Sequence, residues 1–176
     1  MKNVLKLTLA VMMTLGATSL FAQKFGRINT QELIMLMPET KEMQTNMEAF
    51  AKEIQDNLET IRVEFNTKLA DYQKNYETLS DSVKQLKEKE LQELQNRSSE
   101  FEQVAQQDYQ KKQNELLAPI VSKAKEAIDK VSKAGGYLVV FDISTGSLAY
   151  FDEAALTDIA PEVRRELGIS ETAAAN

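Results

Sequence analysis

The chain has 176 residues, a formal charge of −6, no cysteine and no histidine. Without these two residue types it can form neither disulfides nor Cys/His zinc sites, and it lacks the common catalytic triads and thiol nucleophiles. Its net negative charge argues against nucleic acid as a partner and gives no general attraction to anionic lipid. We therefore expect a protein that is not an enzyme and uses no cofactor or metal.

The first 22 residues have the pattern of a signal peptide. Lys2 and Lys6 supply positive charge, residues 7–15 are apolar, and small residues precede an expected cleavage after Ala22. A membrane anchor is the alternative, but this apolar run is shorter than the roughly 20 residues that a spanning helix needs. We expect an exported chain that starts near Gln23 and whose charge is −8 once Lys2 and Lys6 are removed.

A long amphipathic helix is expected from Pro38 to about Leu79, after a short strand in residues 24–30 and a short helix in residues 31–37. Apolar residues recur along it in steps of three and four, which is typical of one helix face. A helix of about 40 residues spans roughly 60 Å, more than a compact domain of this size can bury. The stripe consists of Met47, Phe50, Ile54, Leu58, Ile61, Phe65, Leu69, Tyr72, Tyr76 and Leu79.

Residues 80–82 (SDS) predict the tip of a helical hairpin, because Ser and Asp favour turns and helix N-caps. The spacing from Ser82 to Gln85 matches a capping box. A second helix is expected up to Ala134, kinked at Pro119 and ended by the two glycines that follow. Residues 38–134 thus predict an arm of two antiparallel helices, and their apolar stripes are interpreted mainly as its core.

The C-terminal part is expected to contain a β-hairpin and a last helix. Residues 137–142 (YLVVFD) predict a strand buried on both faces, and residues 147–151 (SLAYF) a second strand after a turn. The later elements are a short helical stretch ending near Ile159, a helix in residues 161–167 stopped by Gly168, and a disordered tail in residues 170–176.

The fold class is therefore α+β, a long helical hairpin on a small β-rich body. The body, residues 23–37 and 135–169, is too small to be comfortably stable alone, and disulfides and zinc are excluded. We expect self-association through apolar residues of the strands. These predicted interface residues are Phe25, Ile28, Leu138, Val140, Phe141, Leu148 and Tyr150.

Four segments, in this order, carry a resemblance to a known family. They are residues 24–30 (KFGRINT), 116–131 (LLAPIVSKAKEAIDKV), 137–142 with Leu148-Ala149-Tyr150, and 156–159 (LTDI). The chain resembles the Skp/OmpH family of periplasmic chaperones. The resemblance implies a homotrimer whose helical arms enclose a cavity. In that cavity family members hold unfolded outer-membrane proteins without ATP.

Residues that could touch such a client are Met43, Met47, Tyr72, Tyr76 and Leu79, although packing within the arm is an alternative for each. Residues 71–90 at the tip hold four cations and five carboxylates, a sum of −1. The best-known members of the family are strongly basic and have cationic arm tips, whereas this chain is acidic. This difference argues against contact of its tips with lipid or lipopolysaccharide.

Two other functions remain in view. A non-enzymatic scaffold or spacer of the cell envelope would use the arm as a rod, although a spacer should have a continuous apolar seam. An enzyme could use Asp142 and Asp152 as a carboxylate pair, but turn and cap roles fit these residues better.

Overall fold

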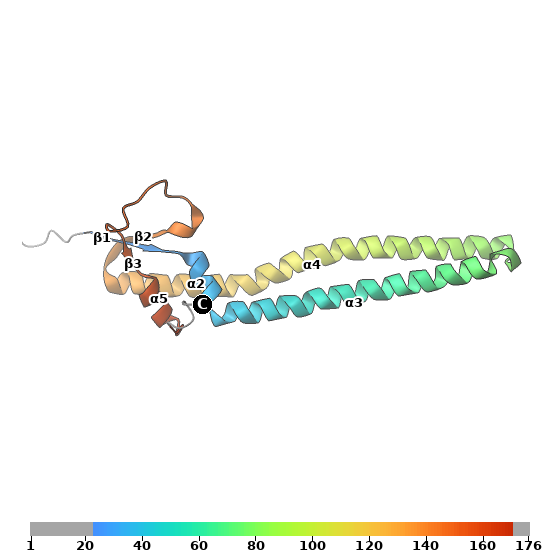
Figure 1. The fold of residues 1–176 in the computed structure, drawn as a ribbon, viewed down its shortest axis with the longest axis horizontal. Helices are drawn as coiled ribbons and strands as arrows, with labels where there is room; N and C mark the ends of the chain where they lie inside the picture. Colours follow the sequence, from blue (N-terminus) through green and yellow to red (C-terminus); the bar gives the residue numbers. More distant parts are fainter. Residues whose placement is uncertain (1–22, 171–176) are drawn as a thin grey trace, which may run out of the picture. The chain divides into compact units, whose positions relative to one another are not determined.

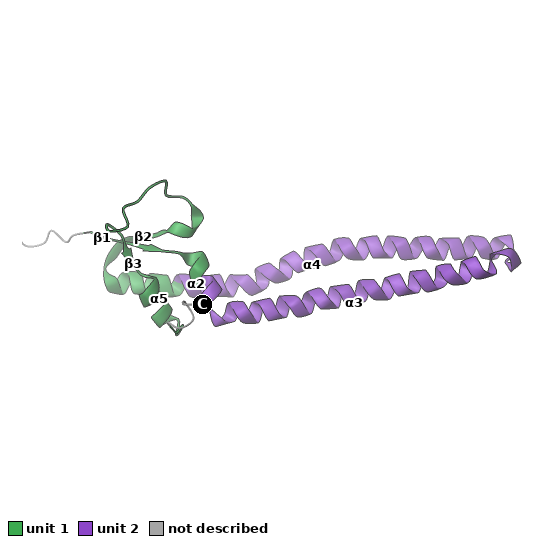
Figure 2. Ribbon diagram, in the orientation of Figure 1, with its two compact units in different colours: residues 1–33, 126–176 green, residues 34–125 purple. Residues whose placement is uncertain are grey.

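The computed structural model describes residues 23–170, which form the elements labelled in Figure 1. The predicted signal peptide lies outside the described residues, as does the predicted tail from residue 171. The chain divides into two compact units, residues 1–33 with 126–176 and residues 34–125. Figure 2 shows them in green and purple; we call the first the β-rich unit and the second the hairpin.

The hairpin consists of two long helices that run antiparallel (Figure 1), as predicted. Helix α3 spans Pro38–Asn75 and is followed by the 3-10 turn η1, Tyr76–Thr78. Helix α4 spans Asp81–Gly135 and continues into the β-rich unit. Pro38 begins α3 because its missing N–H is not needed in the first helical turn. Helix α4 passes through Pro119 without ending.

The capping-box interpretation at the tip is wrong. Helix α4 begins at Asp81, so Ser82 lies inside the helix rather than at its N-cap. The backbone carbonyl of Ser80 accepts from the N–H groups of Val83 and Lys84, both at 3.0 Å. The predicted turn at residues 80–82 lies close to the observed one, because the chain leaves the 3-10 turn at Thr78 and enters α4 at Asp81.

The core of the hairpin is a thin seam between α3 and α4. The buried residues Met47, Ile61, Leu94, Ala105 and Ile120 are each less than 8% exposed. Other residues of the seam, such as Ile54, Leu58 and Phe65, are only half-buried. Two helices alone cannot cover the apolar side chains on their flanks, so the hairpin keeps much of its apolar surface in solvent.

The β-rich unit contains a three-stranded parallel sheet in the order β2-β1-β3. Strand β1 spans Lys24–Ile28, β2 spans Tyr137–Asp142, and β3 spans Thr157–Asp158. Helix α2 (Thr30–Leu36) follows β1, and helix α5 (Ala160–Glu166) follows β3. The first strand, the short helix after it and the last helix were all predicted from the sequence.

The predicted β-hairpin is wrong. Residues 147–151 form no strand, and the predicted helical stretch before Ile159 is replaced by turns and by strand β3. After β2 the 3-10 turn η2, Ile143–Thr145, ends at Gly146, whose φ is +65°. The following loop leads to the far side of β1, where Thr157 pairs with Gly26 in parallel. A strand that returns to the first strand in parallel cannot close a hairpin with β2.

Three side chains form the centre of the β-rich unit's core. Ile28, Ile159 and Val163 are at most 2% exposed, and the Ile159 N–H donates to the Arg27 carbonyl at 3.1 Å. A side chain at Gly26 would be crowded, because a β-carbon there would lie 3.2 Å from Val140 Cγ2 and 3.3 Å from Ile159 Cγ2. Glycine at this position lets the side chains of Val140 and Ile159 approach the backbone of β1 closely.

Asp142 links the end of β2 to the start of α2. Its carboxylate accepts hydrogen bonds from the Thr30 hydroxyl and from the N–H groups of Thr30 and Ser144, at 3.3 and 2.9 Å respectively. Burial alone would raise the pKa of Asp142, but the hydrogen bonds from Thr30 and Ser144 outweigh it and hold the pKa below its ordinary value.

Asp142→Asn is expected to destabilise the β-rich unit by roughly 1–3 kcal/mol at neutral pH, because buried donors lose a charged acceptor. A lowered pKa stabilises the fold above the unfolded value of about 4, and this contribution is lost as the pH falls through the folded value. The difference between wild type and variant should therefore shrink below about pH 4. Hydrogen exchange of the β1 and β2 amides measures this difference in stability. A difference that stays the same at low pH would show that the charged carboxylate of Asp142 is not its cause.

Candidate functional site on the hairpin

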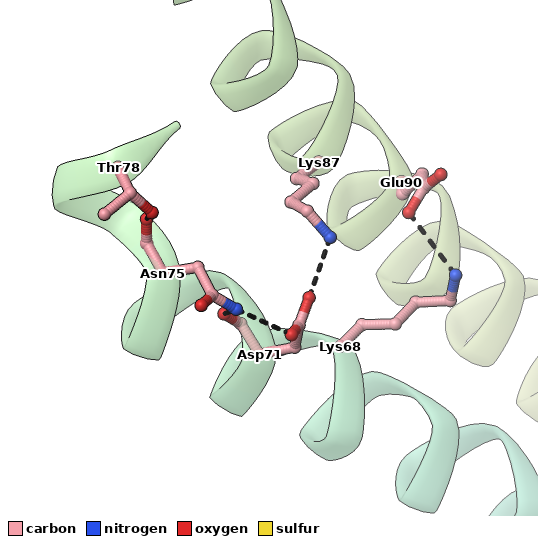
Figure 3. A network of polar contacts seen from close by, with 6 residues as sticks. All are labelled: Lys68, Asp71, Asn75, Thr78, Lys87 and Glu90. Carbon is pink, nitrogen blue, oxygen red and sulfur yellow. Dashed lines mark hydrogen bonds and ion pairs between the residues drawn. The ribbon is translucent and has the colours of Figure 1, made fainter. Parts of the chain in front are cut away.

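A network of charged side chains joins the two helices near the tip (Figure 3). Lys87 Nζ on α4 donates to Asp71 Oδ2 on α3 at 2.8 Å, and Lys68 Nζ donates to Glu90 Oε2 at 3.3 Å. Asn75 Nδ2 also donates to Asp71 Oδ1, at 2.8 Å. The hydrogen bond from Lys87 is the main reason why the pKa of Asp71 is lowered and that of Lys87 raised. These pairs fix the register of the helices but, being exposed, stabilise it only weakly.

The two tip tyrosines that the sequence offered as client contacts form part of this surface. The Tyr72 hydroxyl donates to Glu88 Oε1 at 2.5 Å, and this hydrogen bond raises the pKa of Tyr72 to about 12. The ring of Tyr76 packs edge-on against Tyr72, at 5.4 Å between centroids, and lies under Lys84 Nζ at 4.2 Å. Tyr76 is 43% exposed, while Leu79 is half-buried.

The two methionines proposed for client contact have different surroundings. Met47 is 6% exposed within the seam, so a client could reach it only if the helices separated. Met43 is half-buried and lines a hollow of about 280 Å³ together with Leu116, Pro119 and Ile120. At the rim of this hollow Lys123 Nζ forms an ion pair with Glu39, whose pKa is lowered chiefly by that hydrogen bond.

Large apolar side chains remain exposed along the whole hairpin. Sequence reasoning did not single out three of these, Val63, Val104 and Val121, which are 53%, 52% and 42% exposed. They lie one or two positions away from the buried seam residues Ile61, Ala105 and Ile120, and therefore outside the stripe. Valine out of phase with an amphipathic stripe was the signal that could have identified them. The remaining exposed apolar residues of the hairpin are Met35, Tyr76, Val83, Leu86 and Tyr109.

The predicted interface residues are distributed between the surface and the core of the β-rich unit. Leu138 is 61% exposed and Tyr150 is 86% exposed, whereas Ile28 is buried within its own chain. Phe25 and Phe141 stack at 6.5 Å between ring centroids and, like Val140 and Leu148, stay half-buried. Strand β2 was predicted to be buried on both faces, but in the single chain Leu138 and Val139 face solvent.

Comparison with known proteins assigns this architecture to a family. The family model "Outer membrane protein (OmpH-like)" matches residues 24–167, from the start of β1 to just past the end of α5. The chain belongs to the OmpH-like (Skp/OmpH) family. The match includes both units, so the sheet and the helical hairpin are both part of the family's fold.

Two curated relatives are similar over nearly their whole length. "Chaperone protein Skp" from Yersinia enterocolitica is 24% identical over 152 residues, 86% of this chain and 90% of the relative. The protein of the same name from Photorhabdus laumondii is 22% identical over 156 residues, 89% of this chain and 93% of the relative. Among solved structures, an OmpH-like protein from Caulobacter crescentus CB15, described as an outer membrane chaperone, has the same fold. Its TM-score is 0.71 at 14% identity, over 82% of this chain and 83% of that one.

The described part of this OmpH-like chain contains no arrangement suited to metal chemistry. No group of three or more acidic side chains in residues 23–170 is placed to hold a metal ion. Asp142 is used in the link to α2, and Asp152 Oδ1 accepts from the Ala154 N–H at 2.9 Å in a turn, so both have structural partners. Within the same residues, no helix combines the length and apolar content that crossing a membrane requires.

Proposed function

We propose that this chain is an ATP-independent holdase of the periplasm that binds unfolded outer-membrane proteins and prevents their aggregation. The observation that carries the proposal is an OmpH-like hairpin that leaves large apolar side chains uncovered along its whole length. Soluble proteins rarely keep such surface exposed without a partner for it. The relatives named as chaperones support the same function.

The chemistry of the exposed side chains suits a changing set of partners. Valine, methionine and tyrosine spread along a two-helix scaffold offer many weak apolar contacts. Such contacts hold an unfolded chain without imposing a shape on it. A protein that binds an unfolded client shifts the client's folding equilibrium by mass action alone. Holdase activity therefore needs no nucleotide.

We further propose that the functional unit is a homotrimer joined through the body, residues 23–37 and 135–169, with the client held between the arms, residues 38–134. One edge of β2 has no partner among the described strands, and two residues of this strand, Leu138 and Val139, are exposed. An apolar edge strand of this kind is a template for pairing with another chain. Leu148 and Tyr150 in the adjoining loop would be covered in the same contact. The trimeric number itself comes from the resemblance to the family.

The location follows from the proposed export signal. If residues 1–22 are removed after Ala22, the mature chain would enter the compartment through which outer-membrane proteins pass while still unfolded. N-terminal sequencing of the protein purified from a periplasmic extract tests this. The expected first residue is Gln23; a chain that still carries residues 1–22 would contradict the cleavage.

Light scattering tests the holdase proposal. A urea-unfolded outer-membrane barrel protein is diluted into buffer with and without the mature chain, in the absence of nucleotide. We expect aggregation to be suppressed when the trimer and the unfolded client are present at nearly equal concentrations. A scaffold or spacer protein would leave the aggregation of several such clients unchanged, and that result would overturn the proposal. Sedimentation equilibrium tests the oligomer separately, and a stable folded monomer at micromolar concentration would contradict it.

A further inference from the structure

One flank of the hairpin is hollowed half-way along its length. A hollow of about 400 Å³ has Leu58, Ile61, Phe65 and Leu94 as its apolar wall. A second hollow, of about 250 Å³, lies against Ile54, Ala105 and Tyr109. Both hollows are lined by Leu58 and Glu102, so they form one continuous groove across the two helices. The groove is large enough for apolar side chains of an extended segment.

The stretch of the hairpin that contains this groove is strongly negative, and the lining of the groove itself holds two carboxylates, Glu59 and Glu102, and one cation, Arg62. Residues 48–66 and 91–110 hold nine carboxylates and three cations, a net charge of −6, whereas the tip is close to neutral. All three cations are already paired within the chain: Lys52 with Asp56 at 2.6 Å, Arg62 with Glu59 at 3.9 Å, and Arg97 with Glu64 at 3.6 Å.

Glu102 differs from the other carboxylate of the groove, Glu59. The side chain of Glu102 is exposed, lines both hollows, and has no ion-pair partner anywhere in residues 23–170. A cation placed beside the apolar wall would find an acceptor at Glu102, while an anion would face a lining in which two carboxylates outnumber the one cation, Arg62. Like charges near a binding surface cost affinity and turn away the wrong partner.

We infer that this groove selects client segments in which lysine or arginine stands next to apolar residues. The inference rests on the proposed holdase function and names the class of segment that the hairpin prefers. An apolar side chain of the segment enters the hollow, and the neighbouring cation pairs with Glu102. The surrounding charge of −6 adds a longer-range attraction that salt screens.

Matched peptides test the inference on the full mature chain. One fluorescent peptide alternates leucine with lysine, and its partner alternates leucine with glutamate; anisotropy measures their binding. We expect tighter binding of the lysine peptide, with a preference that weakens in about 0.5 M salt. Glu102→Gln should lower the affinity for the lysine peptide about two- to fivefold. Glu100→Gln is the control, because Glu100 is exposed and unpaired in the described chain but does not line the groove.

The outcomes separate this inference from the holdase proposal. Equal binding of the two peptides would overturn the inference, even if the wild type still suppresses aggregation of an unfolded barrel protein. Equal effects of Glu102→Gln and Glu100→Gln would also overturn it, because net charge and not the groove would then set the preference. Loss of aggregation suppression in the wild type would instead refute the holdase function. Circular dichroism confirms that both variants keep their helices.

Discussion

Ile159→Ala is expected to unfold the β-rich unit and to dissociate the proposed trimer while the hairpin keeps its helices. Ile159 is fully buried, and its Cγ2 lies 3.3 Å from where a β-carbon on Gly26 would be. Removing buried methyl groups leaves a cavity that costs about 2–5 kcal/mol. A unit this small has little stability in reserve, so a loss of that size decides whether it folds.

Hydrogen exchange measures this effect locally, because circular dichroism of this chain is dominated by its long helices. The β1 and β2 amides should lose protection in Ile159→Ala, and sedimentation should show a lower mass. Ile159→Val is the matched control and should cost only about 0.5–1.5 kcal/mol. Unchanged protection of β1 in the alanine variant would show that Ile159 does not hold the sheet to α5.

The double variant Val63→Gln with Val104→Gln is expected to suppress aggregation much less well than the wild type, with no loss of folding stability. Both valines are about half exposed, at 53% and 52%, on α3 and α4 respectively. Covering two valines with a client is worth about 1.5 kcal/mol or more in total, which corresponds to roughly a tenfold change in affinity. Exposed sites of this kind change folding stability by less than about 0.5 kcal/mol.

The measurement is the concentration of the chain that halves the scattering of an unfolded barrel protein. The control exchanges neighbouring exposed polar residues, Asn66→Gln with Gln103→Asn, and should leave that concentration unchanged. If the valine variant performs as well as the wild type, clients do not bind the middle of the hairpin. An equal loss in the control would point to a general effect of mutating the helices.

The helices were predictable because their signals are local. The stripe from Met47 to Leu79 has a single period, and Pro38, the turn at Ser80 and the glycine pair after Ala134 mark the ends. Each of these is a property of a few neighbouring residues. Gly136, the second of these glycines, takes a left-handed conformation with φ at +68°. The hairpin can therefore be predicted from the apolar periodicity and the residues that end its helices, without knowledge of long-range contacts.

The small sheet was predicted, but the pairing of its strands was predicted wrongly because strand pairing is long-range. Residues 137–142 were recognised as a strand, but their partner is β1, which lies more than 100 residues earlier. Strand β3, Thr157–Asp158, is exposed and has no apolar pattern, and the buried Ile159 follows it directly. Residues 147–151 have strand-like composition, yet none of the strands in residues 23–170 pairs with them.

The candidate site was predictable in kind but not in position. Methionine and tyrosine content indicated adaptable contacts, yet Met47 is buried and Tyr72 is hydrogen-bonded to Glu88. The exposed valines and the groove at Glu102 depend on how two helices face one another, which a stripe on one helix does not specify. The acidic middle of the hairpin is visible in the sequence, but the pairing of Arg97 on α4 with Glu64 on α3 is not.

Fluorescence of a bound client tests the central claim most directly, because this chain contains no tryptophan. An unfolded outer-membrane barrel protein that has tryptophans is diluted from urea and titrated with the mature chain without nucleotide. The account predicts a saturable change in tryptophan emission that ends at a fixed ratio of trimer to client, with the client still unfolded by circular dichroism. Emission that does not respond to the chain, for several clients, would contradict it.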